Sequence, residues 1–238
     1  VWGSVLPDGG LFFYTNSSLD HNALYGRLIR YENNATNNRF VTANDGVFFN
    51  RQVGNTGTYN EAVLIDGTLQ SSNGSGNASL FSGSFSYPTQ PGGFPTRFSV
   101  TPDPLYALPA GKVATTAMIV GTYKMAGTGF GGDTTTLKVF ADGAITGLTT
   151  SGCEVAGKLL GELGSGLNLY RVEAFGYLKS PNGPITCELA SGPPQSGSAS
   201  AQFDANGNVI GLRILAAGLS VAGSRARTVF VGAKQLTP

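Results

Sequence analysis

The stretch "LKVFADGAITGLTTSGCEVAGKLL", residues 137–160, alternates apolar and polar residues on both sides of Asp142-Gly143. Alternation with a period of two is typical of a β-strand that buries one face. Asp-Gly tolerates the positive φ angles that type I′ hairpin turns require. The stretch therefore predicts two antiparallel strands joined by a tight turn, followed by a further strand that begins with a thiol at Cys153.

Similar runs recur along the whole chain. They cover residues 10–15, 25–31, 46–53, 61–65 and 78–87, then 119–127, 134–141, 144–150, 153–160, 167–178, 185–190, 197–204, 208–216 and 227–236. Further turns are predicted at Asp45-Gly46, Asp66-Gly67, Asn182-Gly183 and Asn206-Gly207. We predict an all-β fold of antiparallel, up-and-down strands, and a meander of about eight strands protects its edges by closing into a barrel.

A proline-rich segment, residues 86–109, separates the two sets of strands. Proline removes a backbone donor and fixes φ, so this segment is predicted to be extended and poorly paired. We place a boundary near residue 112, between an N-terminal β lobe (1–112) and a C-terminal barrel lobe (113–238), with a single large sandwich as the alternative. For residues 104–120 the sequence favours neither of two alternatives, a helix of one or two turns or an irregular connection.

Composition excludes some classes of function. Only 12% of the residues are charged and the net charge is +1, so no basic surface for nucleic acid is expected. No apolar run approaches the roughly 20 residues that a membrane-spanning helix needs. Because the sequence begins at Val1 without methionine, we interpret it as a mature or truncated form from which a signal peptide or lipid anchor has been removed.

The chain has two cysteines, Cys153 and Cys187, and neither belongs to a CxxC motif or adjoins a histidine. Zinc binding and thiol redox chemistry are therefore not indicated. A disulfide formed in an oxidising compartment fits a chain rich in Gly, Ser, Thr and Asn. Two buried free thiols remain the alternative.

Three motifs have both a functional and a structural interpretation. The single histidine, His21, is predicted to lie in a surface loop, because no nucleophile motif accompanies it. Residues 127–132, "GTGFGG", resemble a phosphate loop but precede a strand, so a hairpin loop is preferred. Residues 204–211 have the Asp-x-Asn-x-Asn spacing of a calcium loop, but Val209 and Leu215 replace its glycine and its last acid, which favours a hairpin turn.

Two further sets of residues also have both a functional and a structural interpretation. Glu154 and Glu173 are the acids nearest to a pattern for glycoside hydrolysis, although alternation places both on a solvated face. Tyr87, Phe94 and Tyr106 lie in the proline-rich segment. These aromatic residues are candidates for a recognition surface, and covering one end of a barrel is the favoured alternative.

The motifs "GTYKMAG", "FADGAITG", "SGCEVAG", "LNLYRVEAFGYL" and "ITCELASG" follow one another in residues 119–236. In this order they resemble uncharacterised small bacterial envelope lipoproteins, which are similar to the lipocalin-like eight-stranded barrel lobes of transferrin-binding protein B. The resemblance implies an exported protein, originally lipid-anchored or secreted, in which Cys153 and Cys187 bridge two strands of the second barrel. It implies no catalytic residues, and the chain lacks the family's lipobox cysteine.

The leading hypothesis is a non-enzymatic envelope or cell-surface protein that acts through binding or assembly. The partner is a protein or small molecule, no cofactor or metal is expected, and a membrane is reached only through a lipid anchor upstream of residue 1. The expected location is the periplasm, the outer membrane or the extracellular space. The alternatives are a carrier of a small ligand in a barrel interior and a structural subunit of a surface layer or filament.

Overall fold

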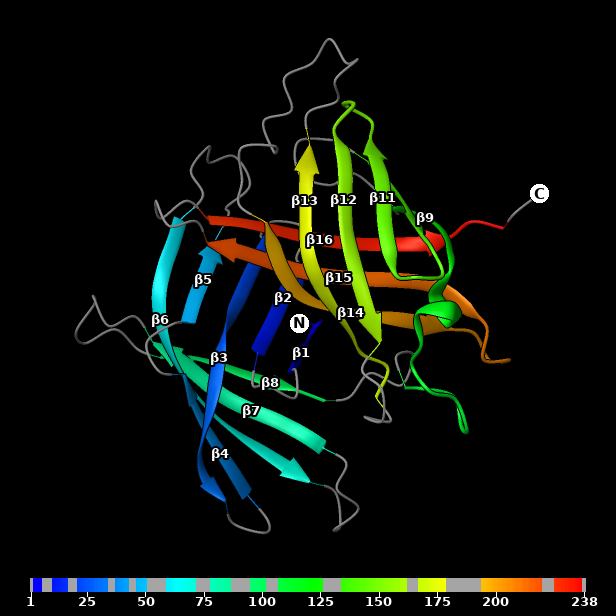
Figure 1. Cartoon of the computed structure of the whole chain (residues 1–238). Helices are drawn as coiled ribbons and strands as arrows, with labels where there is room; N and C mark the ends of the chain where they lie inside the picture. Colours follow the sequence, from blue (N-terminus) through cyan, green and yellow to red (C-terminus); the bar gives the residue numbers. More distant parts are fainter. Residues whose placement is uncertain are drawn as a thin grey trace. The chain divides into compact units, whose positions relative to one another are not determined.

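The structure is a computed structural model. It describes residues 2–5, 10–16, 21–33, 37–42, 46–50, 59–71, 78–86, 95–101, 107–125, 134–161, 167–178, 194–219 and 225–236. The chain divides into two compact units, Val1–Asp103 and Pro104–Pro238. Both units consist of antiparallel strands (Figure 1), which confirms the all-β prediction.

The unit Pro104–Pro238 contains a closed barrel of eight antiparallel strands, each paired with its neighbour in sequence. The strands are β9 (Gly121–Met125), β10 (Thr135–Val139), β11 (Ala144–Thr149), β12 (Glu154–Gly161), β13 (Tyr170–Leu178), β14 (Gln195–Phe203), β15 (Val209–Leu219) and β16 (Arg225–Lys234). Pairing of β16 with β9 closes the barrel. The predicted up-and-down barrel is confirmed for this unit, whereas the predicted strand 185–190 lies outside the described residues.

The turn between β10 and β11 differs from the predicted type. The amide of Gly143 donates to the carbonyl of Phe140 at 2.9 Å, and the amide of Phe140 donates to the carbonyl of Ala144 at 2.9 Å. Gly143 has φ +82°, but Asp142 does not have a positive φ. This is a three-residue hairpin loop in which a left-handed glycine follows a type I turn. A side chain at Gly143 would also place its Cβ 2.0 Å from the carbonyl oxygen of Leu159.

The same loop geometry recurs twice in the barrel. In the β11–β12 loop the amide of Gly152 donates to the carbonyl of Thr149, and in the β14–β15 loop the amide of Gly207 donates to that of Asp204. Both glycines have a positive φ, +88° and +77°. The Asp-Gly and Asn-Gly dipeptides that end at Gly143 and Gly207 therefore correctly predicted where the chain reverses, but not the type of turn.

The barrel interior is filled by a continuous apolar core. Its largest fully buried side chains are Tyr123, Tyr170, Phe175 and Phe230. Small inward residues also contribute to this core, among them Ala199 and Ala201 on β14 and Ala216 on β15. Large and small inward side chains together fill the interior, as is usual for a barrel of eight strands.

A bulge keeps this alternation intact on β13. Ala156 pairs with Gly176 and Lys158 pairs with Glu173, so two residues, Ala174 and Phe175, lie opposite the single residue Gly157. Ala174 has φ +48°, a left-handed conformation that is uncommon for alanine. Because of the inserted residue, Val172 and Phe175 both face the core although they are three positions apart.

A single turn of 3-10 helix, η2 (Thr116–Ile119), precedes β9 and packs against one end of the barrel. Ala114 and Ile119 are buried in the barrel core, with Leu108 and Met118 packed against it. The Thr116 hydroxyl donates to the carbonyl of Ala141 at 3.0 Å. The helix left open for residues 104–120 is thus one short turn in the described residues, and it covers the end that we call the η2 end.

The unit Val1–Asp103 contains one antiparallel sheet of eight strands, in the order β1-β2-β3-β4-β6-β7-β8 with β5 paired to β3 and β6. The strands are β1 (Trp2–Val5), β2 (Gly10–Asn16), β3 (His21–Asn33), β4 (Asn37–Thr42), β5 (Gly46–Asn50), β6 (Tyr59–Ser71), β7 (Ala78–Ser86) and β8 (Thr96–Val100). The ring of Phe13 on β2 lies 5.7 Å from the rings of both Phe81 on β7 and Phe98 on β8. The sheet therefore curves enough to bring distant strands together around an aromatic core.

Two predictions for this unit are wrong. Asp66-Gly67 lies inside the long strand β6 and forms no turn. Glycine is needed there for packing, because a Cβ on Gly67 would lie 2.8 Å from the ring of Phe81. The proline-rich segment 86–109 also contains a strand, β8, which begins directly after Pro95 and pairs along its length with β7.

Candidate functional site

The polar groups buried at the η2 end have hydrogen-bond partners. The Tyr123 hydroxyl donates to the carbonyl of Ile119 at 2.8 Å, and the Tyr170 hydroxyl lies 3.7 Å from the Met118 sulfur. Burial is the main cause that raises the pKa of both tyrosines, with Tyr170 adding to the effect on Tyr123. Both are therefore neutral over the physiological range, which suits a structural role at this end.

Asn168 extends the β13–β14 pairing beyond the start of β13. Its side-chain amide donates to the carbonyl of Ala201, and its side-chain oxygen accepts from the amide of Ala201 at 3.0 Å. Asn168 is buried and lies two residues before Tyr170, so it faces the same side of the chain. The side chain thereby satisfies two backbone groups that would otherwise be buried without partners.

The opposite end of the lumen carries a layer of buried polar side chains. Thr135, Thr149 and Gln195 lie where β10 begins, β11 ends and β14 begins, and all three are buried. The Thr228 hydroxyl lies 3.4 Å from that of Tyr177, whose ring makes an edge contact with Phe175. We call Thr135, Thr149, Gln195, Thr228 and Tyr177 the polar end.

Gln195 differs from the other members of the polar end. It is only 3% exposed, and its Oε1 has no hydrogen-bond partner among the residues that the structure describes. A buried acceptor without a partner costs about 1–3 kcal/mol. Gln195 therefore marks the place in the described lumen where a hydrogen-bond donor would be accommodated most favourably.

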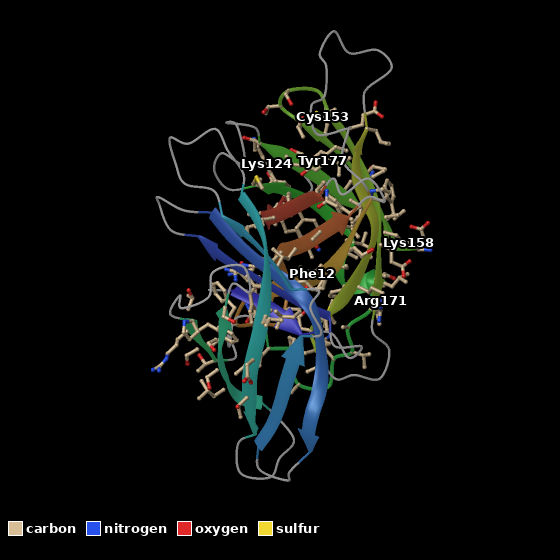
Figure 2. All side chains as sticks on the ribbon, turned by 90° about the vertical axis from the view of Figure 1, so that its left-hand side faces the viewer. Phe12, Lys124, Cys153, Lys158, Arg171 and Tyr177 are labelled. Atoms are coloured by element: carbon tan, nitrogen blue, oxygen red, sulfur yellow. The ribbon has the colours of Figure 1, made fainter. Side chains whose placement is uncertain are left out.

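Cys153 lies in the β11–β12 loop, near the end of the barrel opposite η2 (Figure 2). Its amide donates to the Thr149 hydroxyl at 2.9 Å, and the Ser151 hydroxyl lies 3.8 Å from its sulfur. Cys153 is buried. Cys187 lies outside the described residues, so the bridge between the two stays a prediction.

The outer surface of the barrel has a groove of about 530 Å³ over strands β9 to β13. Alternation and register place ten outward residues on these five strands in two rows, and all of them except Lys124 and Gly176 line the groove. The first row is Lys124, Thr136, Leu148, Glu154 and Leu178, and the second is Thr122, Lys138, Thr146, Ala156 and Gly176. We call these ten residues the β9–β13 face.

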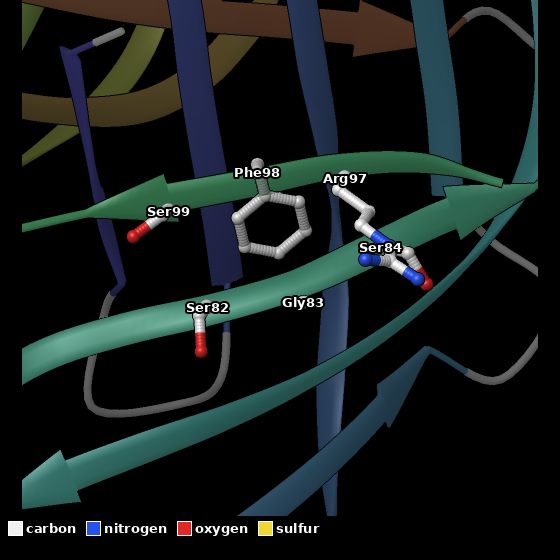
Figure 3. A pocket seen from close by; sticks show the side chains of 6 residues that line it. All are labelled: Ser82, Gly83, Ser84, Arg97, Phe98 and Ser99. Atoms are coloured by element: carbon white, nitrogen blue, oxygen red, sulfur yellow. The ribbon is translucent and has the colours of Figure 1, made fainter.

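A second depression, of about 520 Å³, lies between β7 and β8 in the other unit (Figure 3). Ser82 and Ser84 on β7 pair with Ser99 and Arg97 on β8, and Gly83 and Phe98 complete the lining. Three hydroxyls and one exposed guanidinium make this depression polar and basic. The ring of Phe98 also contacts the rings of Phe13 and Phe81, so this residue belongs to the aromatic core of the unit as well.

The structure separates the two acids singled out from the sequence. Glu154 pairs with Leu178, whereas Glu173 pairs with Lys158 several residues away along the same two strands. Both alternate outward, as Lys158 and Arg171 do on the outer wall of the barrel (Figure 2). The two carboxylates therefore do not converge on one cleft, and no group of three or more metal-binding side chains occurs within the described ranges.

The calcium-like motif forms the β14–β15 loop. Oδ1 of Asp204 accepts from the amides of Asn206 and Asn208, and Oδ2 accepts from the side-chain amide of Asn208. These bonds, led by the one from the Asn208 side chain, lower the pKa of Asp204. The carboxylate is thus committed to its own turn.

The structure describes only some of the remaining candidate residues. His21 is not in the predicted surface loop but is the first residue of β3, where it pairs with Asn16 of β2. Residues 127–132 lie outside the described residues, but the strand β10 follows them, and a phosphate loop needs a helix there. The aromatic trio Tyr87, Phe94 and Tyr106 also lies outside the described residues.

Asn168, Gln195 and the β9–β13 face were not singled out from the sequence. Asn168 had a signal, because it occupies the inward position before Tyr170 in "LNLYRV". Gln195 follows two prolines and begins an otherwise small-residue run, which gave no periodicity to mark it as buried. The face had no signal, since its members come from five strands whose register only the fold sets.

No helix within the described ranges is long and apolar enough to cross a bilayer. Comparisons of the chain with protein-family models, with curated proteins and with solved structures found no match.

Proposed function

We propose that this chain is a non-enzymatic, exported surface protein that acts through binding or assembly on its outer faces. The observation that carries the proposal is the filled lumen. Tyr123, Tyr170, Phe175 and Phe230 occupy the interior, and no fully buried side chain among the described residues is charged. Sites for recognition are then left to the outside of the barrel, where the β9–β13 face carries the groove.

The first test is a panel of glycan, ester and peptide substrates, assayed with the full chain and with the Glu154→Gln and Glu173→Gln variants. We expect no turnover above the buffer rate for any of the three proteins. Turnover that one of the two substitutions abolishes would contradict the proposal. The matched variant Gln202→Glu, on the outer side of β14, controls for a change of charge alone.

Export and the disulfide form part of the same proposal. A bridge between Cys153 and Cys187 fits an oxidising compartment, as in the envelope lipoproteins that the sequence resembles. We expect alkylation of the denatured protein to label no thiol without reductant and two with it, as measured by intact mass. Two labelled thiols without reductant would remove the bridge and the main argument for export.

We further propose that Val1–Asp103 is a second barrel-like lobe. The support is the curvature that brings Phe13 of β2 to 5.7 Å from Phe98 of β8, near the two ends of the sheet order. Closure predicts slow hydrogen exchange for every amide of Thr96–Val100. If alternate amides of β8 exchange at the rate of unpaired backbone, β8 is an open edge and the sheet is not a barrel.

A small-ligand carrier is the second candidate, and Gln195 is the observation that favours it. A guest with an N–H or O–H donor would satisfy the Oε1 that has no partner in the described lumen. Native mass spectrometry of the purified full chain would show a co-purified mass that is lost in Gln195→Met and kept in Gln202→Met. Identical spectra without any added mass would exclude the carrier.

A further inference from the structure

The η2 end of the barrel exposes apolar side chains on the loops and strand ends that form its rim. Leu236, directly after β16, is 93% exposed, and Phe140, directly after β10, is 37% exposed. Single exposed apolar residues need no explanation, but here several share one end. Among the described residues, the large apolar side chains exposed at this end are Val113, Val120, Phe140, Leu167, Ile210 and Leu236. We call these six residues the η2 rim.

The η2 rim surrounds the barrel and does not form one flat patch. Val120 precedes β9 and Phe140 follows β10, and these two strands are paired. Leu167 precedes β13, which lies on the opposite side of the closed barrel from β9. Ile210 is on β15, between these two sides. A rigid protein partner would need a socket that encircles the end, whereas lipid surrounds any side chain that enters it.

Lysine side chains lie beside the η2 rim. The ammonium of Lys138 lies 4.9 Å from the centre of the Phe140 ring. A Cβ on Gly121 would lie 2.7 Å from Cε of Lys234, so the stem of this lysine lies over the glycine that begins β9. Lys112 is exposed in the segment before η2. Such stems cover apolar surface while the ammonium reaches a polar boundary.

The acidic side chains on the described loops of the same end are committed to those loops. Oδ1 of Asp142 accepts from the amide of Ala144 at 3.0 Å, and Oδ1 of Asp204 accepts from the amide of Asn208 at 2.8 Å. The strands near this end add two positive side chains and one negative one, Lys158, Arg171 and Glu173. The described part of this end is therefore positive overall and attracts anionic surfaces.

We propose that the η2 rim inserts into the interface of a bilayer that contains anionic lipid. Apolar side chains that enter the interface and basic side chains that meet the headgroups both contribute to such binding. The η2 rim supplies the first kind, and Lys112, Lys138 and Lys234 supply the second. Because the apolar residues are single side chains and not a long hydrophobic segment, the binding is reversible and needs both contributions.

This inference rests on the proposed function, because it names a partner for the outer surface of an exported protein. Absence of vesicle binding would overturn the inference and leave the non-enzymatic function standing, since turnover assays decide that function. Turnover would overturn the proposed function whatever the protein does on lipid. The two failures are therefore distinguishable.

The first experiment measures sedimentation of the full chain with two kinds of vesicle. One kind is pure phosphatidylcholine, and the other contains about a quarter phosphatidylglycerol. We expect binding to the anionic vesicles that weakens at high salt, and much less binding to the neutral ones. Lys112→Gln and Lys138→Gln are each expected to weaken binding about fivefold, the contribution of one basic residue near an anionic surface. No binding to anionic vesicles, or equal binding to both kinds, overturns the proposal.

The second experiment removes apolar side chains without changing charge. In the same assay Phe140→Ser is expected to weaken binding to anionic vesicles by about tenfold. Leu236→Ser is expected to act in the same direction, and this variant keeps the fold because the side chain is almost fully exposed. The matched control is Leu148→Ser, at a position that is 53% exposed toward the opposite end of the barrel. Equal losses for Leu236→Ser and Leu148→Ser overturn the assignment to the η2 rim.

The third experiment locates the bound end directly. An environment-sensitive fluorophore is attached to the full chain at Val113→Cys or, as the control, at Leu178→Cys at the opposite end of β13. On addition of anionic vesicles we expect a blue shift from the label at position 113 and none from the label at position 178. A shift from position 178 alone, from both labels or from neither overturns the proposed orientation.

Discussion

The two ends of the barrel differ in the hydrogen bonds that their buried polar groups make. At the η2 end the Tyr123 hydroxyl reaches the carbonyl of Ile119, and Asn168 pairs with both backbone groups of Ala201. At the polar end Gln195 is buried to the same degree, yet its Oε1 has no partner in the described part of the chain. The η2 end therefore stabilises the fold. At the polar end, the Oε1 of Gln195 could still accept a hydrogen bond.

The largest test of this contrast is Ile119→Ala. Removing a fully buried side chain that covers the η2 end should lower the free energy of unfolding by about 2–5 kcal/mol, measured by denaturant titration. Ile210→Ala, at a half-exposed position on β15, should change it by less than about 0.5 kcal/mol. Equal effects would mean that η2 does not close this end of the barrel.

Asn168→Ala tests the hydrogen bonds of the same end. The substitution leaves the amide and the carbonyl of Ala201 without their side-chain partner, and the unfolding free energy should fall by about 1–3 kcal/mol. Asn206→Ala, in the exposed β14–β15 loop, provides the control, with an expected change below about 0.5 kcal/mol. Similar losses for both variants would show that Asn168 has no special role.

Gln195→Met should have the opposite sign. It replaces a buried amide without a partner for its oxygen by an apolar side chain of similar length, so the unfolding free energy should stay the same or rise by up to about 1–3 kcal/mol. A clear loss of stability would reveal a partner for Gln195, such as an ordered water. The two ends would then differ in whether the hydrogen-bond partners are protein groups, and not in how much their buried polar groups stabilise the fold.

The sequence predicted the barrel better than the first unit for physical reasons. Strands β10 to β12 alternate cleanly because one face is core and the other is solvent, and Gly143 marks a reversal by its positive φ. Strand β4 reads "NNRFVT", which lacks an apolar period, and β8 follows prolines, so both were missed. Gly67 led to a wrong prediction of a turn, because glycine occurs both in turns and where an aromatic ring packs closely against the backbone.

The candidate site was less predictable than the fold. Partners such as Asn168 and Ala201, 33 positions apart, meet only once the register of β13 and β14 is fixed. The β9–β13 face likewise depends on register across five strands. Local patterns identify which residues lie in strands, and the closure of the barrel decides which of them become neighbours.

Tyr123→Phe sharpens the comparison at high pH. The lost bond to Ile119 should cost about 0.5–1.5 kcal/mol near neutral pH. The pKa of Tyr123 is raised in the fold above its usual value of 10.0, so stability is fully present below pH 10 and falls as the unfolded chain ionises above it. The variant should lose less stability than the wild type between pH 10 and 11, and parallel curves would show that Tyr123 does not titrate in this way.

The smallest effect concerns two loops of the same geometry at opposite ends. The β14–β15 loop is held by the Asp204 carboxylate, whereas the β11–β12 loop at the polar end is held by the neutral Thr149 hydroxyl. The pKa of Asp204 is lowered below its usual 3.8, so the support is present above pH 3.8 and is lost as the pH falls through the folded value.

An acid titration followed by amide proton shifts separates the two loops. The Asn208 amide, which donates to Asp204, should move with a midpoint below pH 3.8, while the Cys153 amide, which donates to Thr149, should stay constant. Asp204→Asn keeps a side-chain acceptor and removes the titration, so its Asn208 amide should no longer move. Movement of both amides in the wild type would mean that acid loosens the barrel as a whole. Acid sensitivity confined to one loop would instead show that the two ends respond to solution conditions independently.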